Sequence, residues 1–186
     1  CNTFIADHNC DELLAFATSA IRESSNSDAI LKKIKQETGV ELQVLDGEHE
    51  AVLTFLAVRR WFGWSSGRLL VADIGGGSLE VAIGADEHPE LAKSTPLGAG
   101  RLTRDFFSSE TPSADEVKAL RKHVQATLQS DFADLIRGDF DHAVATSKTF
   151  RQLARLGGAA PSSEGQRIQR ELSLETLDRW VPKLTE

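Results

Sequence analysis

The apolar positions of this chain change period several times, and each change marks a predicted element. Runs of consecutive or alternating apolar residues, typical of short strands, cover 13–17, 40–45, 69–74, 79–83, 91–96 and 141–145. Helical spacing with start or stop signals predicts helices over 27–38, 46–62, 97–107, 114–136, 150–156 and 174–184, and a helical turn carries Arg22. Because strands and helices alternate, the pattern predicts an α/β protein.

Two of the predicted helices carry apolar stripes that indicate core faces rather than cofactor sites. The stripe of the long helix comprises Val117, Leu120, Val124, Leu128, Phe132, Leu135 and Ile136. The stripe of the last helix comprises Leu177, Trp180, Val181 and Leu184. The run 13–17 is predicted to be a short buried strand, and the turn-rich segment 63–67 is a candidate boundary between two halves.

Composition narrows the functional classes. The chain has 186 residues, enough to bury a core, and a net charge of −7, which argues against broad nucleic-acid binding. It contains no apolar run long enough to span a membrane and no charged-then-apolar leader. Cys1 and Cys10 cannot make a disulfide framework, so a reducing cytoplasm is expected.

The stretch VADIGGGSLEVAIG at 71–84 carries the strongest chemical signal. Its three glycines, Gly75, Gly76 and Gly77, are predicted to turn tightly with positive φ and to offer N–H groups to an anion, and Ser78 adds a hydroxyl. Asp73 and Glu80 flank this loop, and carboxylates beside a phosphate site suit a hard cation such as Mg²⁺. Three glycines alone favour an ordinary hairpin with a flexible tip and two solvated acids, and the flanking strands and paired acids shift the balance toward a binding function. It is neither a Walker A loop nor a dinucleotide fingerprint, because no Gly-Lys-Ser/Thr follows and a strand replaces the helix.

Two predicted strands end on hydroxyl residues that open a helical turn. Thr18 and Ser19, with Arg22, suit an oxyanion at the carboxyl end of a strand, although an ordinary cap with a surface arginine fits equally well. Ser147 and Lys148, with Thr149, repeat the arrangement. The segment 97–101 is either a further anion site at a helix start or a simple turn.

The first turn of the helix capped by Asp46 holds three ionisable residues: Glu48, His49 and Glu50. Acids there stabilise the helix dipole, which is the ordinary explanation. Alternatively, one of them faces a ligand and acts as a general base on water.

Five segments taken in order resemble the exopolyphosphatase and guanosine pentaphosphate phosphohydrolase (Ppx/GppA) family, and most closely its actinobacterial-type members. They are ATSAIR at 17–22, VLDGEHEA at 44–51, DIGGGSLE at 73–80, PLGAGRL at 96–102 and ATSKTF at 145–150. The resemblance covers nearly the whole chain. It implies the actin-like ATPase (ribonuclease H-like) fold, with part of the first domain at 1–66 and most of the second at 67–186.

The resemblance also implies an activity and roles for individual residues. The expected reaction removes terminal phosphates from inorganic polyphosphate or guanosine pentaphosphate with Mg²⁺ or another divalent cation. Glu50, directly before Ala51, matches the family's catalytic base, and Asp73 and Glu80 match acids near the metal. The resemblance assigns phosphate binding to Gly75, Gly76, Gly77, Ser78 and Arg22, and the hydroxyl segments described above add Thr18, Ser19, Ser147 and Lys148 to the phosphate-binding set.

Two departures from the family pattern lead to further expectations. The chain contains no Asp-x-Gly-Ser phosphate hairpin and starts at Cys1 without methionine, so it is expected to be a fragment. Alone it should have weak or no activity, and it should pair with missing chain or with itself as a homodimer. Residues 146–149 lack the glycine-rich turn of many relatives. The alternatives to a hydrolase are a non-catalytic phosphate- or nucleotide-binding module and a kinase of the same fold. No nucleic-acid or membrane partner is expected.

Overall fold

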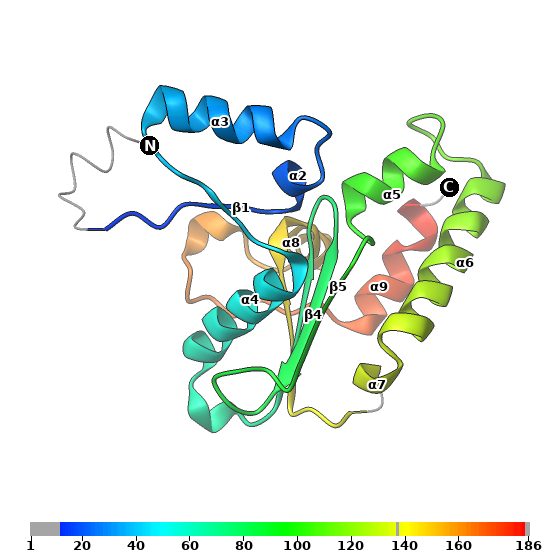
Figure 1. The fold of residues 1–186 in the computed structure, drawn as a ribbon. Coiled ribbons are helices and arrows are strands. Elements are labelled where there is room, and N and C mark those ends of the chain that lie inside the picture. The colour runs from blue at the N-terminus through cyan, green and yellow to red at the C-terminus, as the bar shows by residue number, and fades with distance from the viewer. Residues whose placement is uncertain (1–11, 137, 185–186) are drawn as a thin grey trace.

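The computed structural model describes residues 12–136 and 138–184, so predictions for Cys1 and Cys10 lie outside the described residues. Its amino-terminal part contains β1 (Phe16–Ala17), α2 (Ser19–Arg22), α3 (Ser27–Thr38) and β2 (Gln43–Val44), and β1 pairs with β2 in parallel. This part lies to one side of the main sheet (Figure 1). Helix α3 ends as predicted at Gly39, whose φ of 73° is left-handed.

The two predicted amino-terminal strands are much shorter than expected. Leu13 and Leu14 are 46% and 62% exposed, and Phe16 is 42% exposed, so the prediction of a buried strand over 13–17 is wrong except at Ala17. The physical reason is the sheet itself. A ladder of two residues on two strands provides too little surface to cover either face.

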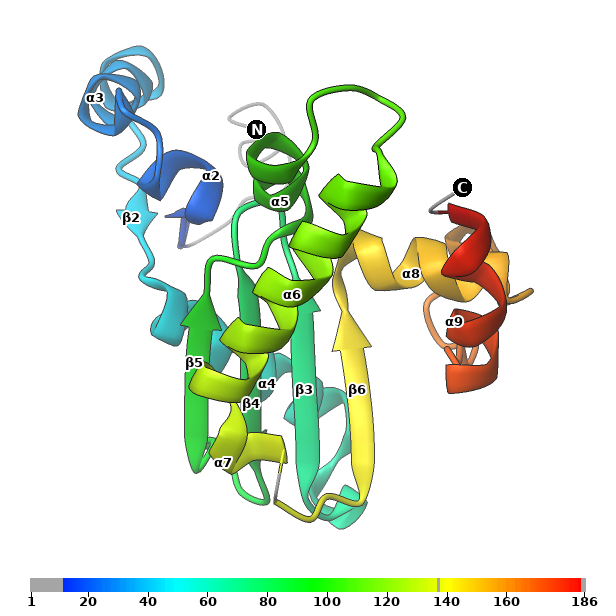
Figure 2. The same ribbon diagram turned by 90° about the vertical axis from the view of Figure 1, so that its right-hand side faces the viewer.

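The main sheet has four strands in the order β5-β4-β3-β6 (Figure 2). They are β3 (Leu69–Ile74), β4 (Leu79–Gly84), β5 (Leu91–Thr95) and β6 (His142–Thr146). Strands β3, β4 and β5 form an antiparallel meander, and β6 joins β3 in parallel after a long helical crossover. These strands lie within one residue of each predicted end.

Helices cover both faces of this sheet. Helix α4 (Gly47–Phe62) packs on one face, and α6 (Ala114–Asp131) crosses the other, together with α5 (Ala99–Phe106) and α7 (Ala133–Ile136) (Figure 2). The α4 face buries Phe55, Val58, Leu69, Val71 and Ala82. The α6 face buries Leu79, Ile83, Leu97, Phe132 and Leu135, and the α6 side chains Val124 and Leu128 pack against them, as the stripe predicted.

The carboxyl-terminal part lies beyond β6 at the edge of the sheet. It contains α8 (Ser147–Leu156), α9 (Leu174–Trp180) and the short 3₁₀ turns η2 (Ser162–Glu164) and η3 (Pro182–Leu184); a third 3₁₀ turn, η1 (Trp64–Ser66), follows α4. Helix α9 ends at Trp180 because Pro182 cannot continue it. Val181 and Leu184 are 37% and 56% exposed, so the prediction that they are buried is wrong. Throughout the two described ranges, every helix is too short or too polar to cross a bilayer.

Candidate functional site

A row of four polar side chains crosses the sheet near the carboxyl ends of β3 and β6. The strand register places Ser94, Glu80, Asp73 and Thr146 side by side on β5, β4, β3 and β6. Alternation puts them on the α4 face, because Val71 and Ala82, two residues away on the same strands, belong to the core under α4. Ser94 donates to Glu80 Oε1 at 2.9 Å, and Thr146 donates to Asp73 Oδ2 at 2.5 Å. The row therefore holds two carboxylates, each oriented by a neighbouring hydroxyl.

Helix α4 places Glu50 over this row. The Asp46 side chain caps the helix by accepting from the His49 N–H at 2.8 Å, and Phe55 and Val58 anchor the following turns in the core. Glu50 lies at the edge of the buried face, whereas Glu48 and His49 are exposed. The His49 ring pairs only with Asp46, at 2.7 Å. Of the three candidates in this turn, Glu50 alone is directed toward the sheet.

Burial and mutual repulsion perturb the carboxyl groups of the site. The pKa of Glu50 is raised by burial and by the negative charge of Glu80, with a smaller contribution from Asp73, while Arg22 opposes the shift. The pKa of Glu80 is raised by burial and by Asp73, against the hydroxyls of Ser78 and Ser94. The void that Ala51 and Thr54 of α4 form with Asp73 and Glu80 has no room for a water molecule, so the two acids are desolvated on that side. The three acids form one electrostatically coupled group.

Arg22 is the cation closest to this group. Its guanidinium donates to the Leu45 carbonyl at 2.5 Å and lies 3.4 Å from Glu50 Oε2. The preceding residues, Thr18 and Ser19, start the helical turn as predicted, but the Thr18 side chain makes no capping bond. Ser19 is buried where a side chain on Gly77 would meet it. Residues 18–22 therefore contact both Glu50 and the glycine loop.

The glycine loop has a different structure from the one predicted. None of Gly75, Gly76 and Gly77 has a positive φ, so that part of the prediction is wrong. The loop carbonyls instead accept from the start of α5: Ala99 N–H donates to Gly75 O, and Arg101 N–H donates to Gly76 O, at 3.0 and 2.9 Å. A glycine is required opposite the loop, since a Cβ on Gly98 would lie 2.2 Å from the Gly77 carbonyl carbon.

These contacts determine which N–H groups remain for an anion. The start of α5 is already occupied by the loop, so segment 97–101 is a packed turn and not an open anion site. Within the described ranges, the N–H groups of Gly76, Gly77 and Ser78 have no acceptor. Ser78 is 3% exposed, and its hydroxyl lies close enough to the Glu80 carboxylate to lower the pKa of that group but forms no hydrogen bond of ordinary geometry. A buried donor without a partner is costly, which applies to Ser78, whereas Gly76 is exposed and Gly77 half-buried. A phosphate oxygen could accept from all three residues.

The second hydroxyl segment also reaches the polar row. Ser147 begins α8 three residues earlier than predicted, with a φ of 81°, the only positive φ of a non-glycine residue in the described chain. This conformation explains why a glycine-rich turn suits the position. The Ser147 hydroxyl is buried without a partner, and Lys148 is exposed beside it. Thr149 donates to Ile74 O at 3.1 Å, which ties the first turn of α8 to the strand before the glycine loop.

The donor set fits a magnesium ion that shares its ligands with a substrate. The part of the chain that the structure describes has no group of three His, Cys, Asp or Glu residues able to hold a metal by themselves. Asp73 and Glu80, directly opposite across β3 and β4, are two carboxylates on one face. Mg²⁺ commonly binds one or two carboxylates and completes its shell with waters and substrate phosphates. Besides burial, the repulsion from Asp73 contributes to the raised pKa of Glu80, whereas the hydroxyls of Ser78 and Ser94 and the charge of Arg22 lower that pKa.

Sequence reasoning missed Ser94, because nothing in the run 91–96 shows which residues face the acids until the register is known. The Asp73–Thr146 bond was missed for the same reason.

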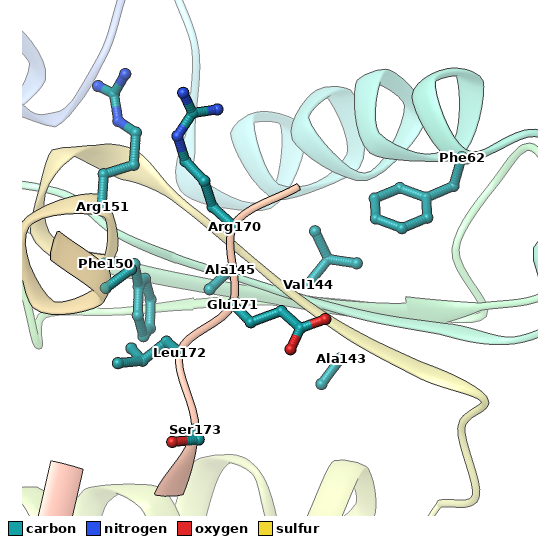
Figure 3. A pocket seen from close by; sticks show the side chains of 11 residues that line it. Phe62, Ala143, Val144, Ala145, Phe150, Arg151, Arg170, Glu171, Leu172 and Ser173 are labelled. Carbon is teal, nitrogen blue, oxygen red and sulfur yellow. The ribbon is translucent and has the colours of Figure 1, made fainter. Parts of the chain in front are cut away.

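The cavity of about 430 Å³ in Figure 3 is a separate feature. It lies between β6 and the coil 170–173, and none of the predicted site residues lines it.

The sequence profile of the Ppx/GppA phosphatase family matches residues 1–186. Exopolyphosphatase 1 of Mycobacterium tuberculosis is 56% identical over 173 residues, which are 92% of this chain and 50% of that protein. The chain therefore spans about half the length of the curated relatives it matches.

Solved structures agree on the fold. The Aquifex aeolicus PPX-GPPA enzyme is 26% identical with a TM-score of 0.76, and the match covers 99% of this chain and 60% of that one. An exopolyphosphatase from Cytophaga hutchinsonii is 24% identical with a TM-score of 0.79 over the same shares. The predicted actin-like fold is confirmed for the part that the chain spans. The boundary between 1–66 and 67–186 stays a prediction; α4, on the amino-terminal side of it, packs on the main sheet.

Proposed function

Because the chain belongs to the Ppx/GppA phosphatase family, we propose that it carries the catalytic acids of a phosphohydrolase that removes terminal phosphates from inorganic polyphosphate or guanosine pentaphosphate. The named activity of its relatives supports this proposal. The proposal concerns the longer protein, since half of each curated relative lies outside the match.

The observation that carries the proposal is the position of Glu50 over Asp73 and Glu80. Burial and its two acidic neighbours raise the pKa of Glu50, which makes its carboxylate a stronger proton acceptor than a surface glutamate. In the proposed reaction, a water attacks the terminal phosphorus and passes a proton to Glu50 as the anhydride bond breaks. Arg22, 3.4 Å from the same carboxylate, would orient Glu50 and attract the phosphate.

Phosphate binding is assigned to groups that the fold leaves without partners. The N–H groups of Gly76 and Gly77, with the hydroxyl of Ser78, would hold phosphate oxygens on one side. Ser147 and Lys148 would hold them on the other, and Ser19, which packs on the loop, would support its shape. Asp73 and Glu80 would hold Mg²⁺, which supplies neutralisation of the developing phosphate charge.

The remaining parts of the proposal concern setting and partners. The protein is proposed to act in the cytoplasm, without a nucleic-acid or membrane partner, and to associate as a homodimer. The exposed Leu13, Leu14 and Phe16 support association of the amino-terminal part with further polypeptide, because they are large apolar side chains on a two-stranded sheet.

The test is Glu50→Gln in the full-length protein, with Glu48→Gln as the matched control. Glu48 lies in the same helical turn but is exposed. We expect kcat for phosphate release from polyphosphate to fall by about 10² or more in E50Q, with KM retained, because a general base is lost. E48Q should stay within about twofold of the parent. Unchanged turnover in E50Q would refute the assignment of the base, and binding without phosphate release by the parent would identify a non-catalytic module.

A further inference from the structure

Helix α8 carries a basic surface that leads away from the proposed site. Lys148, Arg151 and Arg155 follow one another at i, i+3 and i+7, so they lie on one face of the helix, and all three are exposed. Of the apolar side chains of this helix, Ala154 is buried and Phe150 is half-buried. No acidic residue occurs between Ser147 and Leu156, although the chain as a whole carries a net charge of −7.

The charges of this surface are not neutralised within the protein. Other cationic side chains of the described chain, such as Arg60, Arg68 and Arg101, form ion pairs with acids. Within residues 12–136 and 138–184, none of the three cations on α8 forms such a pair; Arg151 donates only to the Ser147 carbonyl, at 3.1 Å. An exposed cluster of like charges repels itself, and a bound polyanion relieves that repulsion.

A neighbouring segment adds to the positive potential. Arg170 extends beside Arg151 and in the same direction, whereas the carboxylate of Glu171 points elsewhere (Figure 3). The guanidinium of Arg170 donates to four backbone carbonyls, including those of Ala160 and Pro161 at 2.8 and 2.7 Å. These bonds fix its position without cancelling its charge, since their acceptors are neutral.

The basic surface begins at the polar row of the site. Thr146, the last residue before α8, donates to Asp73, and Thr149 in the first turn contacts Ile74. From Lys148 to Arg155 the helix advances about 10 Å at 1.5 Å per residue. A ligand whose end lies at Asp73 and Glu80 could therefore continue over this face only if it carries negative charge along an extended chain.

We propose that the α8 face formed by Lys148, Arg151 and Arg155 binds internal phosphate groups of a long polyphosphate chain whose terminal phosphate lies at the site. The inference rests on the proposed function and makes it more specific. A long linear polyanion spans the face, whereas a short oligophosphate or the phosphates of guanosine pentaphosphate end within the site. The α8 face is thus a determinant of substrate length, separate from the groups that act on the scissile bond.

The test compares Arg151→Gln/Arg155→Gln with the matched control Lys118→Gln/Lys122→Gln in the full-length protein. The control removes two exposed charges at the same i, i+4 spacing from α6, on the other face of the sheet. For R151Q/R155Q we expect KM for long-chain polyphosphate to rise about 5- to 30-fold, with kcat retained, and KM for tripolyphosphate to change less than about twofold. The dependence of log KM on log salt for the long chain should become shallower by about one to two units. The control variant should leave KM unchanged for both substrates.

Several outcomes separate this inference from the proposed function. If the parent hydrolyses both substrates and R151Q/R155Q shows equal effects on both or none on the long chain, the α8 inference is wrong. If the parent hydrolyses neither substrate, the proposed function fails, but the α8 inference can still be tested by calorimetric binding of long-chain polyphosphate without Mg²⁺. Weaker binding by R151Q/R155Q than by the control supports the α8 inference, and equal binding overturns it. Arg151→Lys/Arg155→Lys should restore most of the affinity, whereas a variant that fails through misfolding would not distinguish chain lengths.

Discussion

Gly98→Ala provides the sharpest test of how the glycine loop is held. Gly98 has a φ of −72°, which alanine adopts without strain, so the substitution affects contacts alone. Its Cβ would lie 2.2 Å from the Gly77 carbonyl carbon and 2.3 Å from the Ser78 nitrogen, far inside the 3.5–4.0 Å or so at which carbon atoms pack. The loop and the start of α5 must therefore separate by more than 1 Å or so.

The magnitude follows from two contributions. Overpacking in a tight contact costs about 1–3 kcal/mol. Separation also strains the bonds from Ala99 to Gly75 and from Arg101 to Gly76, each of which is worth about 0.5–1.5 kcal/mol. We expect the free energy of unfolding to fall by about 2–4 kcal/mol, and Tm by about 5–15 °C for a chain of this size.

Urea unfolding followed by circular dichroism measures this effect, and Gly76→Ala is the control. A Cβ on Gly76 would meet nothing within 4 Å, and the residue has no positive φ, so G76A should stay within about 0.5 kcal/mol of the parent. Equal stability of G98A and the parent would refute the close packing of loop and helix. If G76A lost as much stability as G98A, the destabilisation would arise from the loop's own conformation and not from its contact with α5.

Two further predictions concern the charges of the site. Because the pKa of folded Glu50 is raised above its ordinary 4.5, the folded chain binds more protons than the unfolded chain between the two values. The free energy of unfolding should therefore fall as pH rises through this window, and Glu50→Gln should flatten that fall in urea titrations at pH 4.5 to 7; a steeper fall in the variant would contradict the sign. Phosphate release should cease in EDTA, and Asp73→Asn should raise the Mg²⁺ concentration for half-maximal rate about tenfold or more, whereas Asp86→Asn, in the turn between β4 and β5, should leave it unchanged.

Much of the fold could be predicted because its signals are local. The apolar runs of β3 and β4, the Asp46 cap and the Gly39 stop each act within a few residues, and the structure places these elements where the patterns indicate. The failures concern burial by distant parts of the chain. The run 13–17 has strand-forming composition, but whether Leu13 and Leu14 are covered depends on neighbours that periodicity does not reveal.

The candidate site shows the same division. Motif matching predicted Asp73, Glu80 and Glu50, the last by its place before Ala51, and the placement of α4 on the sheet adds that Glu50, unlike Glu48, faces the two acids. The roles of Ser94 and Thr146 depend on strand register across β5, β4, β3 and β6, which no single segment encodes. Positive φ was predicted for the loop glycines, whereas the structure shows none there and instead needs a glycine at position 98, where α5 approaches the loop backbone.

The way in which α4 is attached has a mechanical consequence. Glu50 is carried by a helix whose Phe55 and Val58 are embedded in the same core as Val71 and Ala82, the neighbours of Asp73 and Glu80. Arg22, by contrast, belongs to a segment that meets this body mainly through polar contacts, such as the pair between Glu23 and Arg101. Glu50, Asp73 and Glu80 therefore belong to one packed body, and their spacing does not depend on hinge motion of the amino-terminal segment. Any such motion would change the distance from Arg22 to Glu50 while leaving the spacing of the three carboxylates unchanged.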